Sequence, residues 1–200
     1  GNMLNFMKKA LSTRVFAALG AVLLVTGSSG PASSFIFLTK DNKVQPVSGW
    51  NKFHSVPGKC KVSLPAHPEH VKQVMPVPKE GYDLRYDVYV SAFEKKAVYM
   101  MLVAQYPPFM NESYVEESLE SFLNGLVMQN QDNKLIFADL TVVQGHKALD
   151  FFIDSKGVYF KGRAIMANNN LYLLAMECEH KNYLQEHFNH FINSFEIIQQ

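Results

Sequence analysis

The stretch that decides the fold runs from residue 148 to residue 178 and reads ALDFFIDSKGVYFKGRAIMANNNLYLLAMEC. Polar and apolar residues alternate along Ala148–Asp154, Val158–Met166 and Leu171–Cys178, a pattern typical of half-buried strands. Lys156-Gly157 and the asparagines at 168–170 lie between these segments and are typical turn residues. The sequence therefore predicts a three-strand antiparallel meander.

The length of the first turn determines which side chains of the meander share a face. A one-residue slip would exchange the two faces of a strand. A two-residue turn at 156–157 places Asp150 opposite Arg163 and Phe152 opposite Lys161. Opposite charges then align on one face, which also carries Phe152. The other face carries apolar residues: Leu149, Ile153, Phe160 and Ala164.

The second turn decides whether this charged face continues into the third strand. A three-residue turn over 168–170 places Lys161 opposite Glu177, whereas a two-residue turn would place it opposite Met176, which the pattern disfavours. We therefore expect one continuous charged face that contains Asp150, Lys161, Arg163 and Glu177.

Two interpretations of this charged face remain open. Mixed charges are ordinary on the solvated face of an antiparallel sheet, where each cross-strand pair contributes less than about 1 kcal/mol. Alternatively, the four residues form a recognition surface for a polar small ligand or for another protein.

On either side of the meander, the sequence predicts further strands and two helices. The expected elements are a strand at 59–64, a hairpin of 82–93 and 97–106, a strand from 134 to 143, a helix at 112–130 and a final helix at 182–193. Asn111 is a suitable cap for the longer helix, which has acidic residues in its first turn and one apolar stripe. Residues 66–78 contain too many prolines for an assignment. The predicted class is α+β, an antiparallel sheet flanked by helices.

The first 34 residues have the pattern of a secretory signal peptide. Lys8, Lys9 and Arg14 precede an apolar run at 15–26, which is followed by small residues up to Ser34. The run is too short to span a bilayer comfortably, and no second long apolar stretch follows. We expect cleavage after Ser34, a flexible lead over 35–48 and a periplasmic or secreted product; an uncleaved anchor or a buried helix is the alternative.

The charge balance argues against nucleic-acid binding. The 200 residues have a formal net charge of +1, and the three basic residues of the leader are its only charged residues. The rest of the chain therefore carries 16 basic and 18 acidic residues. A nucleic-acid binder needs an excess of Lys and Arg to displace counterions from phosphates.

The two cysteines, Cys60 and Cys178, leave two possibilities open. An oxidising compartment would permit a disulfide between them. The other possibility is two buried thiols that behave as small apolar groups.

Catalytic and metal motifs are weak in this sequence. His67 and His70 lie close together, as do His187 and His190, and residues 177–180 read ECEH. The His-Glu-x-x-His pattern of zinc proteases is absent, as are nucleophile and phosphate-loop motifs. No cofactor is predicted. A metal-dependent or hydrolytic enzyme that uses His and Glu near the final helix remains the alternative to a binding module.

Several short segments resemble the PsbP family and similar bacterial envelope proteins, including DcrB-like lipoproteins. The resemblance covers residues 48–197 and rests on Gly49-Trp50, Phe53, 63–65, the 82–106 hairpin, the helix that ends at 130, 145–148, 171–174 and 191–195. Unlike DcrB-like lipoproteins, this chain has no Cys directly after its apolar run.

The resemblance implies a PsbP-like domain over 49–200, in which helices cover both sides of an antiparallel sheet as an α/β/α sandwich. It also implies a binding or assembly module without chemistry of its own, whose partner is another envelope protein or a small polar ligand. PsbP is an extrinsic subunit of photosystem II, and a relative of the same fold binds the Ran GTPase. This chain has no motif that transfers either role.

Overall fold

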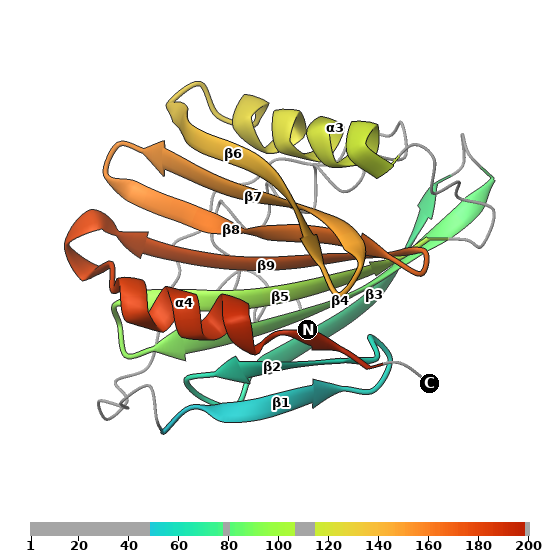
Figure 1. Cartoon of the computed structure of the whole chain (residues 1–200), viewed down its shortest axis with the longest axis horizontal. Helices are drawn as coiled ribbons and strands as arrows, with labels where there is room; N and C mark the ends of the chain where they lie inside the picture. Colours follow the sequence, from blue (N-terminus) through green and yellow to red (C-terminus); the bar gives the residue numbers. More distant parts are fainter. Residues whose placement is uncertain (1–48, 78–80, 107–114, 199–200) are drawn as a thin grey trace.

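The computed structural model describes residues 49–77, 81–106 and 115–198 (Figure 1). The strands are β1 (Asn51–Ser55), β2 (Cys60–Leu64), β3 (Glu69–Val77), β4 (Tyr82–Phe93), β5 (Ala97–Gln105), β6 (Asn133–Val143), β7 (His146–Ser155), β8 (Val158–Ala167), β9 (Asn170–Glu179) and β10 (Glu196–Ile197). The helices are α3 (Val115–Met128) and α4 (Gln185–Ser194), and a short 3-10 turn, η3, covers His180–Asn182.

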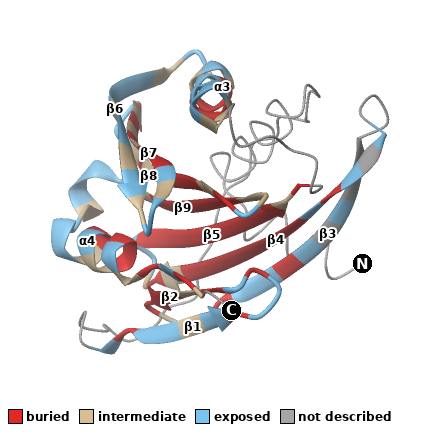
Figure 2. Cartoon of the chain, turned by 45° about the vertical axis from the view of Figure 1, so that its right-hand side comes forward, coloured by how far each residue is buried: buried red, intermediate tan, exposed pale blue. Residues whose placement is uncertain are grey.

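Two antiparallel sheets make up the fold. The larger sheet has seven strands in the order β3-β4-β5-β9-β8-β7-β6, and the smaller has the order β1-β2-β10. The α+β class and the antiparallel sheet are thus confirmed. Figure 2 shows that the central strands β4, β5 and β9 are largely buried, whereas the edge strand β6 is largely exposed.

Each face of the seven-stranded sheet has its own apolar core. Helix α3 packs on one face, here the α3 face, through Leu119, Phe122 and Leu126. Helix α4 and the small sheet pack on the other, here the α4 face, through Trp50, Phe191 and other residues. One face is thus covered by a helix and the other by a helix together with a second sheet. None of the helices in the described ranges is long and apolar enough to cross a membrane.

The register predicted for the first turn of the meander is confirmed. Strands β7 and β8 pair so that Asp150 lies opposite Arg163 and Phe152 lies opposite Lys161. The turn is formed by Lys156 and Gly157, both with positive φ, as a two-residue hairpin requires.

The register predicted for the second turn is wrong. Asn168 and Asn169 alone form the turn, with φ values of 50° and 65°. Asn tolerates this left-handed backbone better than most residues, so a tight two-residue turn is available without glycine. Lys161 therefore pairs with Met176, and Glu177 pairs with Phe160 on the α3 face. Glu177 does not share a face with Asp150, Lys161 and Arg163.

Most other predicted elements are present with shifted ends. The predicted helix at 112–130 is α3, and the last helix begins at Gln185 rather than at 182 because η3 precedes it. Strand β3 falls in the proline-rich 66–78 segment, which had no assignment; it lies at the edge of the sheet, the position where strands tolerate proline. The proposed signal peptide, the 35–48 lead and the Asn111 cap lie outside the described residues.

Candidate functional site

Asp150 and Arg163 form an intramolecular ion pair on the α4 face. Arg163 Nε donates to Asp150 Oδ1 at 2.6 Å, and its Nη2 donates to Oδ2 at 3.1 Å. Both side chains are partly exposed. The planar guanidinium and carboxylate groups match each other in this bidentate geometry. The pair holds β7 to β8 while both side chains keep partial contact with solvent.

Lys161 lies in a cage of aromatic rings on the same face. Its Nζ donates to the Tyr183 hydroxyl at 2.8 Å and lies 4.5 Å from the ring centroid of Phe188. It is also 5.1 to 5.9 Å from the centroids of Tyr183, Phe152 and Phe137. Attraction to several rings at these distances holds the ammonium in place. Lys161 therefore attaches the segment before α4 to the sheet.

Strand β6, next to these groups, exposes an unusual run of apolar side chains. Leu135, Ile136, Phe137, Leu140 and Val142 are each between 36% and 65% exposed, and we call these five residues the β6 edge. Phe137 pairs with Phe152 on the α4 face, and Leu140 pairs with Leu149 on the α3 face. The sequence predicted a strand here, but its place at the edge follows only from the sheet order.

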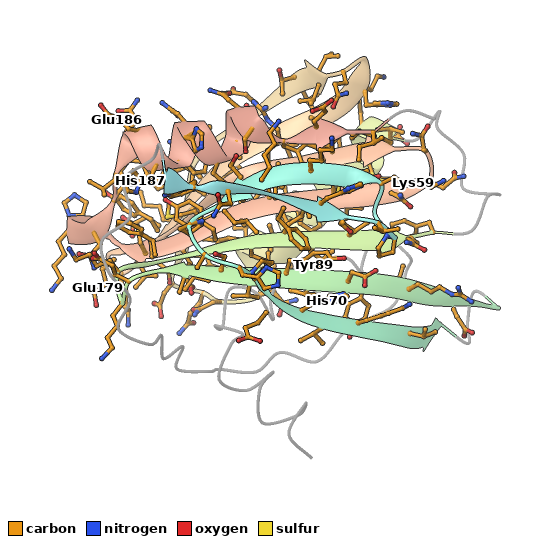
Figure 3. All side chains as sticks on the ribbon, turned by 90° about the horizontal axis from the view of Figure 1, so that it is seen from below. Lys59, His70, Tyr89, Glu179, Glu186 and His187 are labelled. Atoms are coloured by element: carbon orange, nitrogen blue, oxygen red, sulfur yellow. The ribbon has the colours of Figure 1, made fainter. Side chains whose placement is uncertain are left out.

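A second polar cluster lies where β3 and β4 meet β1. Figure 3 shows His70 beside Tyr89, on which it stacks with ring centroids 4.4 Å apart. His70 Nε2 and the buried Asp87 Oδ1 are 2.7 Å apart. Tyr89 in turn shares a 2.7 Å hydrogen bond with Ser55 Oγ. A buried carboxylate that orients a histidine is a common arrangement for a general base. No pattern in the sequence indicated Asp87 as the partner of His70.

His187 and His190, which the sequence offered as metal ligands, both lie against Trp50. Their ring centroids are 5.3 and 5.5 Å from that of the indole, in edge-to-face contact. His187 Nδ1, His190 Nε2, Trp50 Nε1 and Glu94 Oε1 are enclosed without a hydrogen-bond partner in the described part of the chain. Burial lowers the pKa of His187; the charge of Glu186 opposes this shift, His190 adds to it and Glu94 opposes it.

The two cysteines are free and buried. Burial raises the pKa of the Cys60 thiol to about 12, and the charge of Asp87 adds to the shift. Burial also raises the pKa of Cys178 to about 12, with Glu177 and Glu179 adding to it. Thiols that resist ionisation are poor nucleophiles and poor metal ligands. Of the two possibilities left open for the cysteines, the structure therefore shows buried thiols.

The donor groups noted in the sequence do not converge in the structure. Within 49–77, 81–106 and 115–198, no cluster of three or more His, Cys, Asp or Glu side chains has the geometry to hold a metal ion. His180 makes an edge-to-face contact with Tyr159, whereas His187 and His190 pack on Trp50.

Comparison with solved structures shows what this fold resembles. The solution structure of cyanobacterial PsbP (CyanoP) from Synechocystis sp. PCC 6803 superposes with a TM-score of 0.54 at 12% sequence identity. The match covers 80% of this chain and 98% of that chain. A Pseudomonas aeruginosa protein of unknown function matches at a TM-score of 0.31 and 11% identity, over 66% of this chain and 85% of that one.

No protein-family model matches this sequence, and no curated protein matches it either. The match to CyanoP therefore shows a PsbP-like fold. At 12% identity, that match shows similarity of fold and carries no information about function.

Proposed function

We propose that this chain is an exported, non-enzymatic module of the PsbP type that binds another protein of a bacterial cell envelope through the β6 edge. The observation that carries the proposal is the exposure of five apolar side chains on one edge strand. These side chains border the edge of β6 from both faces of the sheet, and large exposed apolar surfaces on folded domains mark interaction sites. An unpaired strand edge can also accept a partner strand through its main chain.

The charged groups beside the β6 edge fit a docking role. Asp150, Lys161 and Arg163 lie on the α4 face of β7 and β8, next to Phe137 and Phe152. Aromatic and Arg side chains are enriched among the residues that dominate protein interfaces. We include the three charged residues in the proposed contact surface, where Arg163 and Asp150 are still partly exposed.

The non-enzymatic part of the proposal has support in the site chemistry. Burial raises the pKa of both cysteine thiols, which disfavours their use as nucleophiles. His70 stacks on Tyr89, and burial raises the pKa of the Tyr89 hydroxyl to about 12 despite its hydrogen bond to Ser55. A histidine with its orienting carboxylate still needs a nucleophile or a bound substrate to act on.

Two matched substitutions test the proposal. Leu140→Asp places a charge on the β6 edge, and Val74→Asp places one at a similarly exposed apolar position on the opposite edge strand, β3. Each variant, with a photo-cross-linking residue at position 137, is expressed in cells of the source organism. We expect one discrete cross-linked product for wild type and for Val74→Asp, and its loss in Leu140→Asp. A product that persists in Leu140→Asp, or its absence in wild type, contradicts the proposal.

A fusion experiment tests export separately. Alkaline phosphatase, which is active only in an oxidising compartment, is joined after residue 48. We expect activity with residues 1–48 present and none when residues 1–34 are deleted. Equal activity in both fusions contradicts the assignment of the leader.

A further inference from the structure

A polar cavity of about 500 Å³ lies at the end of the molecule away from His187. Lys59 from the β1–β2 turn, Gln105 at the end of β5, His146 at the start of β7 and Asn170 at the start of β9 line it. Figure 3 shows Lys59 at the opposite end of the molecule from Glu179, Glu186 and His187. The volume falls within the range of about 300–1,000 Å³ that small-molecule pockets occupy.

Side-chain hydrogen bonds hold the floor of this pocket in shape. The Tyr172 hydroxyl donates to the Gly58 carbonyl at 2.7 Å and accepts from Asn170 Nδ2 at 3.1 Å. Gln105 Nε2 donates to the Pro57 carbonyl at 3.1 Å. These bonds join the β1–β2 turn to β5 and β9. The pocket is therefore formed before any ligand enters, which reduces the ordering entropy that binding must overcome.

The wall of the pocket is held in the same way. The Gln144 side chain accepts from the Ile197 amide at 2.7 Å and donates to the Ile197 carbonyl at 3.0 Å. The Ile198 amide donates to the Lys59 carbonyl at 2.8 Å. Ile197 and Ile198, both lining residues, are thus held in place beside the β1–β2 turn and form the apolar part of the lining.

The charge of the lining is one-sided. Lys59 and His146 are its two basic side chains, and none of the lining residues is acidic. Within the described ranges, neither of these two side chains has an ion pair or a hydrogen bond. A lysine left without a counter-ion over a concave polar surface attracts anions, because the low-dielectric walls strengthen its field.

We propose that this pocket binds a small organic carboxylate. The carboxylate pairs with the Lys59 ammonium beside His146, and the amide groups of Asn168 and Asn170 are within the same lining for a second polar group of the ligand. The short carbon skeleton lies against Ile197 and Ile198. This wall favours a carboxylate with a carbon chain over a bare inorganic anion. The proposal is independent of docking at the β6 edge.

Nuclear magnetic resonance titration of the whole chain tests this site. Butyrate, succinate and inorganic phosphate are added separately at constant ionic strength while the backbone amides of Lys59, His146 and Asn168 are followed. We expect saturable shifts with at least one of the two carboxylates, with a dissociation constant on the order of 1 mM, as suits so few heavy atoms. Shifts with phosphate alone, or none that saturates, overturn the proposal.

Two lysines in the same backbone conformation provide the matched variants. Lys59 and Lys156 both lie in turns with left-handed φ, 53° and 50°, and both are exposed, but only Lys59 lines the pocket. We expect Lys59→Met to weaken carboxylate binding at least tenfold and Lys156→Met to leave it unchanged. His146→Gln is a second variant should Lys59→Met disturb the amide spectrum outside the pocket. Equal affinity in wild type and in both pocket variants overturns the proposal.

Discussion

The two faces of the seven-stranded sheet are built from the same strands but differ in chemistry. On the α3 face, buried apolar side chains of β4, β5, β7, β8 and β9 meet Leu119, Phe122 and Leu126 of α3. On the α4 face lie the Asp150–Arg163 pair, the Lys161 cage, the His70–Asp87 pair and the polar pocket. Because side chains alternate along a strand, one set of strands can supply a packing face and a binding face.

This difference indicates where substitution should affect stability alone. A buried apolar side chain contributes through burial and close packing, with no polar group whose partner could change. The groups of the α4 face, by contrast, have partners that a ligand or another protein could also supply. The predictions below test this division, from the largest expected effect to the smallest.

The largest loss in the free energy of unfolding is expected from Phe122→Ala on the α3 face. Phe122 has no exposed surface, and removing a buried phenyl ring costs about 3–5 kcal/mol through lost burial and the cavity left behind. Urea denaturation followed by circular dichroism measures this loss.

Met128→Ala is the matched control on the same helix. Met128 is 82% exposed, so this change should alter the free energy of unfolding by less than about 0.5 kcal/mol. Similar losses for the two variants would mean that packing does not dominate the α3 face.

A smaller loss is expected from His70→Ala on the α4 face. The change leaves the buried Asp87 carboxylate without the nitrogen 2.7 Å away, and an unsatisfied buried polar group costs about 1–3 kcal/mol. Because the His70 side chain is itself 41% exposed, water can reach its side of the pair, and the loss of stability should lie in the lower part of this range. Chemical denaturation at neutral pH gives the value.

Two further variants test whether the loss of stability comes from the interaction between His70 and Asp87 or from removal of a histidine side chain as such. His54→Ala removes an exposed histidine from β1 and should change stability by less than about 0.5 kcal/mol. Asp87→Asn removes the charge, so the double variant should lose less than the sum of the two single changes. Additive losses would show that the two groups do not interact.

The sequence predicted the local structure well and the partners of the polar groups poorly. Alternation and turn residues gave β4, β5, β7 and β8 with nearly correct ends, because each depends on its neighbours in the chain. Asp150 and Arg163 were placed opposite each other because only a two-residue turn separates their strands. This success depended on local geometry that the sequence displays directly.

The sequence failed to predict features that depend on how distant parts of the chain are placed relative to one another, or on the exact length of a turn. Nothing in the sequence distinguishes a two-residue from a three-residue turn among three consecutive asparagines, and that one-residue difference moved Glu177 to the α3 face. The Lys161 cage combines β6, β7 and α4 with Tyr183. The pocket brings together Lys59 and His146, which are far apart in the chain. Both depend on sheet order, which periodicity does not give.

The smallest expected effect concerns the dependence of stability on pH through His187. Burial against Trp50 and Phe93 lowers the pKa of His187 below its ordinary value of 6.5. Below pH 6.5 the unfolded chain therefore binds a proton at this position more readily than the folded one does, so stability decreases as the pH falls. The charges of Glu186 and Glu94 oppose this shift, whereas that of His190 adds to it.

His187→Gln should therefore reduce the loss of stability between pH 7.5 and pH 5.5, whereas His54→Gln, at an exposed position in β1, should leave it as in wild type. Urea midpoints measured across this range for the three proteins provide the comparison. A steeper loss in His187→Gln than in wild type would reverse the sign and show that the ring is better protonated in the folded state. The Trp50 cluster would then hold a charge, and the α4 face would be stabilised there by electrostatics rather than by the packing of neutral rings.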